Sequence, residues 1–166
     1  PIQVIHYPAD IQPIFDAKCI KCHGKQKKGE PAGKLNLLGD IKGYYSTSYQ
    51  ELASKQLAGP ILSEFTSFRQ GDRGNYNGAM LPPKSLGCYK STMMDLLTDK
   101  AHKKNAKDDH SKMLTPREMM ILGRWVDANY QFYGSYYGRQ NARFAKMKDF
   151  RRKATAAEAI SNVAPE

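Results

Sequence analysis

Two cysteines and a histidine stand close together near the start of the chain, as Cys19, Cys22 and His23 in the pattern Cys-x-x-Cys-His. This spacing is the attachment sequence for c-type haem. Two thiols three positions apart on one tight turn can each form a thioether with one of the two vinyl groups of haem. The residue that follows then brings its imidazole under the iron as the proximal ligand. We therefore expect one covalent haem c, attached through Cys19 and Cys22, with His23 as the proximal iron ligand.

Two other uses of a Cys-x-x-Cys pair fit the sequence less well. A structural zinc site needs two further ligands at short spacing, and the remaining cysteine, Cys88, stands alone. A thioredoxin-like redox pair lies in a βαβ surround, which the flanking Gly, Lys and Pro residues do not indicate. We expect Cys88 to be a buried thiol, with pairing to another chain as the alternative.

The second axial position of the iron decides what such a haem does. Four side chains are candidates for it: Met80, His102, His110 and Met113. Met80 stands just before Leu-Pro-Pro, and paired prolines hold the preceding backbone extended and rigid; the alternative role for Met80 is core filling. His110 lies five residues before Thr115, on the segment that enters the clearest helix of the chain. For His102 and His110 the alternative is a surface position in a loop rich in Lys and Asp.

The elements that must position these residues are expected to be helices. Pro8 can open a helix over residues 9–18, in which Ile11, Ile14 and Phe15 share one face. This helix leads directly into Cys19. Shorter helices are expected over residues 48–55, with Ser48 as the N-cap, over residues 63–68 and over residues 91–100.

The clearest helix signal begins at Thr115. Thr-Pro-Arg-Glu at 115–118 is a capping box with proline at the first helical position, and the pattern ends near Asn129. The aromatic run 130–138 that follows is expected to pack into the core. The alternative for this run is a surface that faces a partner.

The balance of charges indicates the kind of partner. The chain has 26 Lys and Arg against 16 Asp and Glu, a formal net charge of +10, which favours anionic surfaces. No nucleic-acid-binding module is recognisable, so the expected partner is an acidic redox protein or a larger redox complex. The basic segment with Lys25, Lys27 and Lys28 would steer such a partner. No run of about 18 apolar residues is present, so no membrane-spanning helix is expected.

The order of several sequence blocks resembles a known family. His-Tyr-Pro-Ala-Asp-Ile-Gln-Pro-Ile-Phe-Asp-Ala-Lys-Cys at 6–19, Cys-His-Gly at 22–24 and Leu-Asn-Leu-Leu-Gly at 35–39 resemble the cytochrome c domains of planctomycete and anammox proteins. The blocks at 80–83, 110–118 and 125–136 resemble the C-terminal haem domain of the hydrazine synthase alpha subunit and its relatives. The resemblance covers roughly residues 5–138.

The resemblance implies a particular ligand set and role. In that domain two histidines hold the iron, and the haem relays electrons without being the reaction centre. His110 matches the position of the distal histidine, with His102 as the fallback, while Met80 stays open from the sequence itself. The 166 residues do not include the β-propeller and catalytic haem domain of that subunit, so no synthase activity is implied.

These observations together predict an all-α, class I cytochrome c-like domain around one covalent haem, with its first and last helices crossing near the haem. Residues 1–138 would form the cytochrome c domain, and residues 139–166 a basic helical tail that could dock a partner. The expected function is electron transfer by Fe(III)/Fe(II) cycling, without enzyme activity, as a subunit or carrier of a larger redox complex. The alternative is a haem with an open distal site that binds or converts nitric oxide or peroxide. Thioether attachment in the resembling proteins takes place outside the cytoplasm, so a periplasmic or otherwise extracytoplasmic location is expected.

Overall fold

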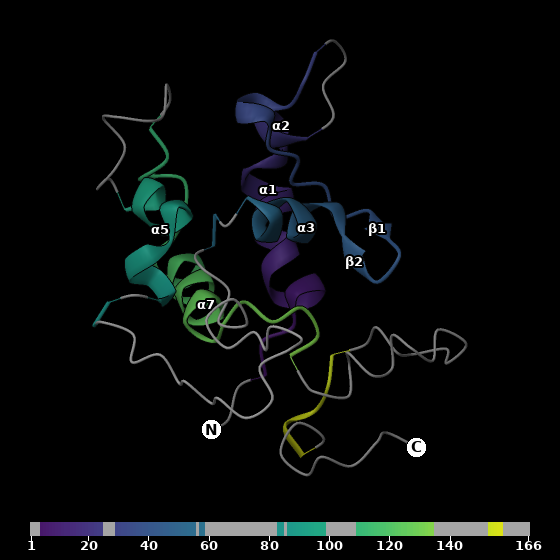
Figure 1. Ribbon diagram of the computed structural model, residues 1–166, viewed down its shortest axis with the longest axis vertical. Coiled ribbons are helices and arrows are strands. Elements are labelled where there is room, and N and C mark those ends of the chain that lie inside the picture. Colours follow the sequence, from purple (N-terminus) through teal and green to yellow (C-terminus); the bar gives the residue numbers. More distant parts are fainter. Residues whose placement is uncertain are drawn as a thin grey trace, which may run out of the picture. The chain divides into compact units, whose positions relative to one another are not determined.

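The computed structural model describes residues 4–24, 29–55, 57–58, 83–84, 86–98, 109–134 and 153–157 (Figure 1). Within these ranges the chain is largely helical and contains one short antiparallel hairpin. Four of the sequence-based expectations lie outside the described residues: Met80, His102, the basic segment 25–28 and the helix over 63–68.

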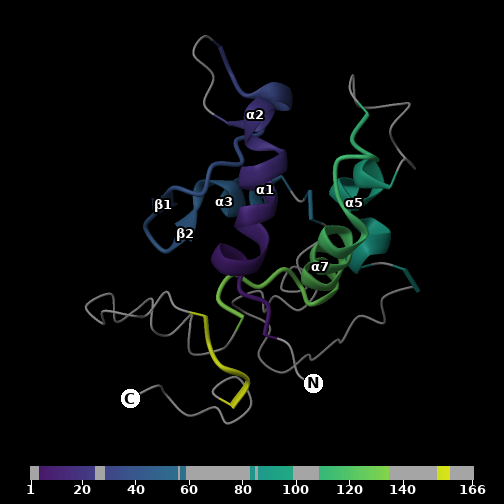
Figure 2. The ribbon, with the colours of Figure 1, turned by 180° about the vertical axis from the view of Figure 1, so that it is seen from behind.

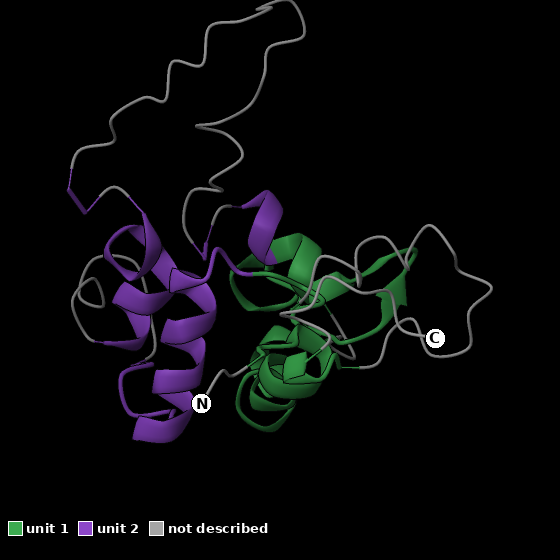
Figure 3. Cartoon of the chain, turned by 90° about the horizontal axis from the view of Figure 1, so that it is seen from below, with its two compact units in different colours: residues 1–51, 131–166 green, residues 52–130 purple. Residues whose placement is uncertain are grey.

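The chain divides into two compact units (Figure 3). Unit 1 comprises Pro1–Glu51 and Gln131–Glu166, and unit 2 comprises Leu52–Tyr130. The cysteines and histidine of the Cys-x-x-Cys-His motif belong to unit 1, whereas His110 belongs to unit 2. Each unit is described by itself below.

Unit 1 begins with two consecutive helical segments that lead to the motif. A π-helical turn, η1 (Tyr7–Ile11), is followed by α1 (Gln12–Lys18) and then by α2 (Ile20–His23) (Figure 2). The single helix expected over 9–18 is therefore split. Pro13 stands in the first turn of α1, where the missing N–H has no helical partner to lose. Because proline has no N–H to donate, the hydrogen-bond pattern of η1 cannot continue through Pro13. This explains why the wider π-helical turn η1 precedes α1.

The described residues of unit 1 that follow in the sequence include a short 3-10 turn, a hairpin and a helix. These are η2 (Ala32–Lys34), β1 (Ile41–Lys42), β2 (Tyr45–Ser46) and α3 (Thr47–Ser54), whose last residues belong to unit 2. In the hairpin Ile41 pairs with Ser46 and Lys42 with Tyr45, and Gly43 at φ +70° makes the turn. The all-α expectation did not include this hairpin. Strands of two residues are too short to show the alternation of apolar and polar side chains from which a strand is predicted. The class I arrangement of the helices stays a prediction.

The expected N-cap of α3 is wrong by two residues. The helix begins at Thr47, so Ser48 lies inside it, and the hydroxyl of Ser46 accepts the amide of Tyr49 at 3.3 Å. Ser46 therefore serves the capping role. Ser48 is instead fully buried and bonds to other side chains of unit 1.

Aromatic side chains form the core of unit 1. Tyr7 stacks on Phe132 with ring centroids 5.4 Å apart, and Tyr49 meets both rings edge-on at 5.2 and 4.9 Å. The amide of Tyr7 also donates to the carbonyl of Phe132 at 2.9 Å. Phe132 and Tyr133 are thus buried in unit 1, and Tyr130 is buried in unit 2, as expected for these aromatic residues; residues 135–138 of the same run lie outside the described ranges.

One ion pair places part of the predicted tail. Lys153 Nζ lies 2.7 and 2.8 Å from the two carboxylate oxygens of Asp10 in η1. Residues 153–157 are the described portion of the predicted 139–166 tail. Both partners belong to unit 1.

In the described part of unit 2 lie a 3-10 turn and two helices with clear end signals. They are η3 (Gly87–Lys90), α5 (Thr92–Leu97) and α7 (Pro116–Asp127). The hydroxyl of Ser91 caps α5 by accepting the amide of Met94 at 3.1 Å, which agrees with the expected start, and the helix ends three residues earlier than expected. Ser91 also donates to the carbonyl of Leu57 at 3.1 Å.

Both ends of α7 follow the expected pattern. Thr115 and Glu118 form the complete capping box, with Pro116 at the first helical position. At the other end Asn129 adopts the left-handed conformation at φ +61°, and the amide of Tyr130 donates to the carbonyl of Trp125 at 2.9 Å. This is a Schellman ending in which asparagine takes the place of glycine.

Candidate haem-attachment site

The Cys-x-x-Cys-His motif occupies the junction of α1 and α2. The amide of Cys19 donates to the carbonyl of Phe15 at 2.8 Å and completes α1. The carbonyl of Cys19 then accepts the amides of Cys22 at 3.1 Å and His23 at 2.9 Å. The three residues that would hold haem therefore lie on one turn, wound around a single carbonyl.

The burial of these side chains suits attachment of a large planar group. Neither thiol forms a disulfide bond; Cys19 is half-buried and Cys22 is exposed. His23 is half-buried, with its Nδ1 atom buried. The residues present thus fit a haem that approaches the exposed side of the turn and is held by two sulfurs and one imidazole.

Gly24 lets the chain leave the motif at once. A Cβ atom at this position would lie 2.5 Å from the carbonyl oxygen of Ile20, closer than side chains tolerate. The chain can therefore turn away from α2 directly after His23 only with glycine there. This close approach is the physical reason for glycine after the motif.

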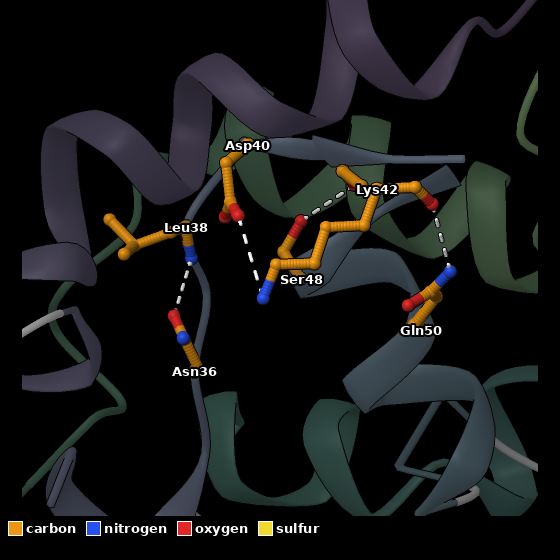
Figure 4. Close-up of polar contacts among 7 residues, drawn as sticks. Asn36, Leu38, Asp40, Lys42, Ser48 and Gln50 are labelled. Atoms are coloured by element: carbon orange, nitrogen blue, oxygen red, sulfur yellow. Dashed lines mark hydrogen bonds and ion pairs between the residues drawn. The ribbon is translucent and has the colours of Figure 1, made fainter. Parts of the chain in front are cut away.

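A strap, defined as residues 35–40, fastens the end of the motif to the rest of unit 1. The amide of Leu37 donates to the carbonyl of His23 at 2.7 Å, and Leu37 itself is buried. The amide of Leu38 donates to the side chain of Asn36 at 3.1 Å (Figure 4). The carbonyl of Leu38 accepts the amide of Ser48 at 3.0 Å. The carbonyl of Asp40 accepts the amide of Thr47 at 2.9 Å. The strap is thus bonded on one side to the motif and on the other to α3.

His110 stands in a tight turn of unit 2, directly ahead of α7. Asp109 Oδ1 accepts the amide of Ser111 at 2.9 Å and its hydroxyl at 2.6 Å, and the carbonyl of His110 accepts the amide of Met113 at 3.2 Å. The side chain of His110 is half-buried. Its assignment as the distal ligand, like the alternatives His102 and Met80, stays a prediction.

Two buried polar residues of unit 1, His6 and Gln12, were not singled out from the sequence as part of the site. His6 is buried and lies against Tyr133, with ring centroids 6.4 Å apart, so it is a packing residue rather than a surface one. Gln12 is 7 % exposed and bonds to the strap. The only signal for Gln12 in the sequence is its spacing from Phe15, which places it on the buried face of α1.

Cys88, the third cysteine, lies outside the motif and has a thiol with a raised pKa. It is half-buried rather than fully buried, and its thiol donates to the carbonyl of Gly123 at 3.4 Å. Burial, together with the neighbouring carboxylate of Asp127, raises the pKa of Cys88 to about 11. The thiol is therefore protonated at neutral pH.

Other features bear on metal and membrane binding. Within the described ranges no group of three or more His, Cys, Asp or Glu side chains is arranged to hold a metal ion. Among the helices in those ranges, none combines the length and apolar character needed to cross a bilayer.

Comparison with protein-family models, with curated proteins and with solved structures finds no match to this chain.

Proposed function

We propose that this protein is a mono-haem c-type electron-transfer protein that serves as a subunit or carrier of a larger redox complex. The observation that carries the proposal is the Cys19–His23 turn, on which two thiols and an imidazole are wound around one carbonyl. When bound, haem supplies one-electron exchange between Fe(III) and Fe(II). The protein's part is to attach it, orient the ligands and control access.

The roles of the motif residues follow from their positions. The Cys19 and Cys22 sulfurs would hold the haem covalently, and the His23 imidazole would bind the iron. Because Nδ1 of His23 is buried, we assign the iron to Nε2. His110 is the preferred distal ligand, because it matches the position of the distal histidine in the domain that the sequence resembles.

The surroundings of the motif favour an acidic partner. Lys18 directly precedes Cys19, and Lys21 stands between the two cysteines in the sequence and is exposed. Together with a formal net charge of +10, they provide attraction for an acidic redox protein or the acidic face of a larger complex. The proposed location is extracytoplasmic, where thioether attachment is carried out in the proteins that the motif resembles.

The attachment is tested by extraction with acidic acetone, which removes haem that is not covalently bound. The chain is expressed with a haem-attachment system, and the wild type is compared with C19S/C22S and with the matched control C88S. We expect the wild type and C88S to retain the pigment and C19S/C22S to release it. A colourless wild type, or one whose pigment is extracted, would end the proposal.

The distal ligand is tested by the spin state of the ferric iron. H110A is expected to convert the iron from low spin to high spin, whereas H102A and M80A leave it low spin. Near-infrared absorption of the oxidised protein separates methionine from histidine ligation. An unchanged low-spin spectrum in H110A would move the assignment to His102 or Met80. High-spin iron in the wild type would instead favour the alternative function, an open distal site for nitric oxide or peroxide.

A further inference from the structure

Gln12 is a buried amide whose hydrogen-bonding groups are directed to defined partners. It is the first residue of α1 and is 7 % exposed. Its Nε2 donates to the carbonyl of Leu37 at 3.0 Å and to the Asp16 carboxylate at 2.8 Å, while its Oε1 accepts the hydroxyl of Ser48. Two acceptors on one side and one donor on the other determine which way the amide points.

The bond to Leu37 connects Gln12 to the haem motif. Leu37 uses both of its backbone groups: its carbonyl accepts from Gln12, and its amide donates to the carbonyl of His23 at 2.7 Å. From His23 the chain of bonds continues through its amide to the Cys19 carbonyl and through the Cys19 amide to α1. Gln12, Leu37, His23, Cys19 and α1 thus form a closed ring of covalent and hydrogen bonds around the motif.

Two further contacts hold Gln12 in place. Tyr7 donates to Ser48 at 2.8 Å, so donors run in one direction from Tyr7 through Ser48 and Gln12 to Leu37. Such chains strengthen their members in a low-dielectric interior. Gly39 of the strap lies directly on the Gln12 side chain, where a Cβ would be 2.8 Å from Cγ. The Gln12 side chain is therefore closely packed against Gly39, and its hydrogen bonds determine which way the amide points.

We propose that Gln12 is a positioning residue for the proximal histidine: it holds the Leu37 backbone, which in turn holds the end of α2 that carries His23. The inference rests on the proposed function, in which His23 binds iron. Partners one step removed from a metal ligand orient that ligand and tune the metal. Removal of the Gln12 donor leaves the buried Leu37 carbonyl without its side-chain partner, so the strap loosens and His23 loses its fixed orientation.

The test compares Q12M with S48A in the haem-loaded protein. Q12M keeps the length of the side chain and removes its donor, whereas S48A cuts the same chain of bonds on the far side of Gln12 and leaves the bond to Leu37. We expect the electron paramagnetic resonance g-values of the ferric iron to shift in Q12M and to shift less in S48A, which loses one contact to Gln12 but keeps the bond from Gln12 to Leu37. We also expect the Leu37 amide to exchange with solvent about tenfold faster in Q12M.

Q12E supplies a second variant, in which a carboxylate replaces the donor and lies beside the Asp16 carboxylate that Gln12 Nε2 contacts at 2.8 Å. Its carboxylate still accepts from Ser48 and cannot donate to Leu37, but its protonated form can donate again. The g-values and Leu37 exchange should therefore return toward wild-type behaviour as the pH falls and the introduced carboxyl takes up a proton. Absence of this recovery in a protein that stays folded would count against a role for the donor to Leu37.

The outcomes separate the two proposals. Wild-type g-values in Q12M, with wild-type exchange of the Leu37 amide, would overturn the positioning role even if haem is bound. A shift in S48A equal to that in Q12M would also overturn it, because stability alone would then account for the change. Absence of covalent haem in the wild type would overturn the proposed function, and Leu37 exchange in Q12M would still report whether the ring of bonds exists.

Discussion

Two ionisable side chains, one in each unit, are held protonated by burial. The hydroxyl of Tyr7 lies in the aromatic core, and burial raises its pKa well above the usual value although Ser48 partly offsets this. The thiol of Cys88 lies beside Asp127, and its pKa rises to about 11. In both cases the folded state binds the proton more tightly than the unfolded state, so stability must fall once the pH is high enough to ionise the unfolded chain.

Tyr7 is predicted to make the free energy of unfolding fall at alkaline pH. Above the usual tyrosine pKa of about 10 the unfolded chain loses this proton and the folded chain keeps it, a slope of about −1.4 kcal/mol per pH unit. Y7F should remove this contribution, at a cost of about 1 kcal/mol at neutral pH for the lost bond to Ser48. Denaturant unfolding between pH 8 and pH 11 measures both effects. Y44F, at an exposed tyrosine, is the control; an unchanged slope in Y7F would contradict the prediction.

Cys88 is predicted to be slow toward thiol reagents. With a pKa of about 11, about one molecule in a thousand carries the thiolate at pH 8, and the alkylation rate should rise about tenfold per pH unit toward that value. D127N removes the negative charge that raises this pKa, so alkylation at pH 8 should become faster, by about tenfold for each unit of pKa lost. Alkylation of the haem-loaded protein, followed by mass spectrometry, measures the rate. D40N leaves the surroundings of Cys88 unchanged; equal rates in D127N and the wild type would show that the Asp127 charge does not raise this pKa.

At the scale of elements, helix ends are governed by chemistry within a few residues. The capping box at Thr115 and the left-handed Asn129 enclose α7, and Ser91 starts α5. The elements that deviate do so because distant residues compete. Ser48 could have capped α3, but its hydroxyl is used by Tyr7 and Gln12, so the cap lies two residues earlier, at Ser46.

The capping box of α7 is predicted to contribute measurably to stability. T115A removes the hydroxyl that accepts the amide of Glu118 at 3.3 Å and should lower the free energy of unfolding by about 1 kcal/mol. T115S keeps the hydroxyl and should retain most of that stability. Thermal or denaturant unfolding of the three proteins measures the difference. Equal losses in T115A and T115S would show that the methyl group, and not the cap, is responsible.

At the scale of the whole molecule, electrostatic attraction by the net charge acts over a longer distance than any other interaction of the chain. A formal net charge of +10 attracts acidic partners over about a Debye length, roughly 10 Å at 0.1 M salt. The position of a positive charge matters once the partner is in contact. Lys21 lies between the two thiols of the motif, whereas Lys112 stands in the turn ahead of α7.

Electron transfer to a small acidic redox protein is therefore predicted to slow with added salt. K21E should reduce the second-order rate at low salt by about threefold more than K112E, although both variants change the net charge equally. The difference should vanish near 1 M salt, where the Debye length is about 3 Å. Stopped-flow mixing with the reduced partner measures these rates. A rate that is flat with salt, or equal in the two variants, would argue against docking near the motif.

Some features of the fold and of the candidate site could be predicted from the sequence, because they depend on residues that are close together along the chain. The spacing of Cys19, Cys22 and His23 predicts attachment chemistry, since a single turn brings i and i+3 together. The capping box at Thr115 and the end of α7 near Asn129 were predicted for the same reason. The packing of residues 130–133 into the core was predicted from their aromatic character, although not which rings they would meet.

The sequence by itself determined the Cys-x-x-Cys-His motif, the ends of α7 and the positive charge, because each depends on residue type at short spacing or on a simple sum. Only the tertiary structure decided the two-residue hairpin, the capping role of Ser46 and the ring of bonds from Gln12 through Leu37 to His23. Gln12 and Leu37 are 25 positions apart, and no local pattern marks them as partners. A buried amide finds its hydrogen bonds wherever the fold brings unsatisfied backbone groups, so its role becomes visible only after the chain has folded.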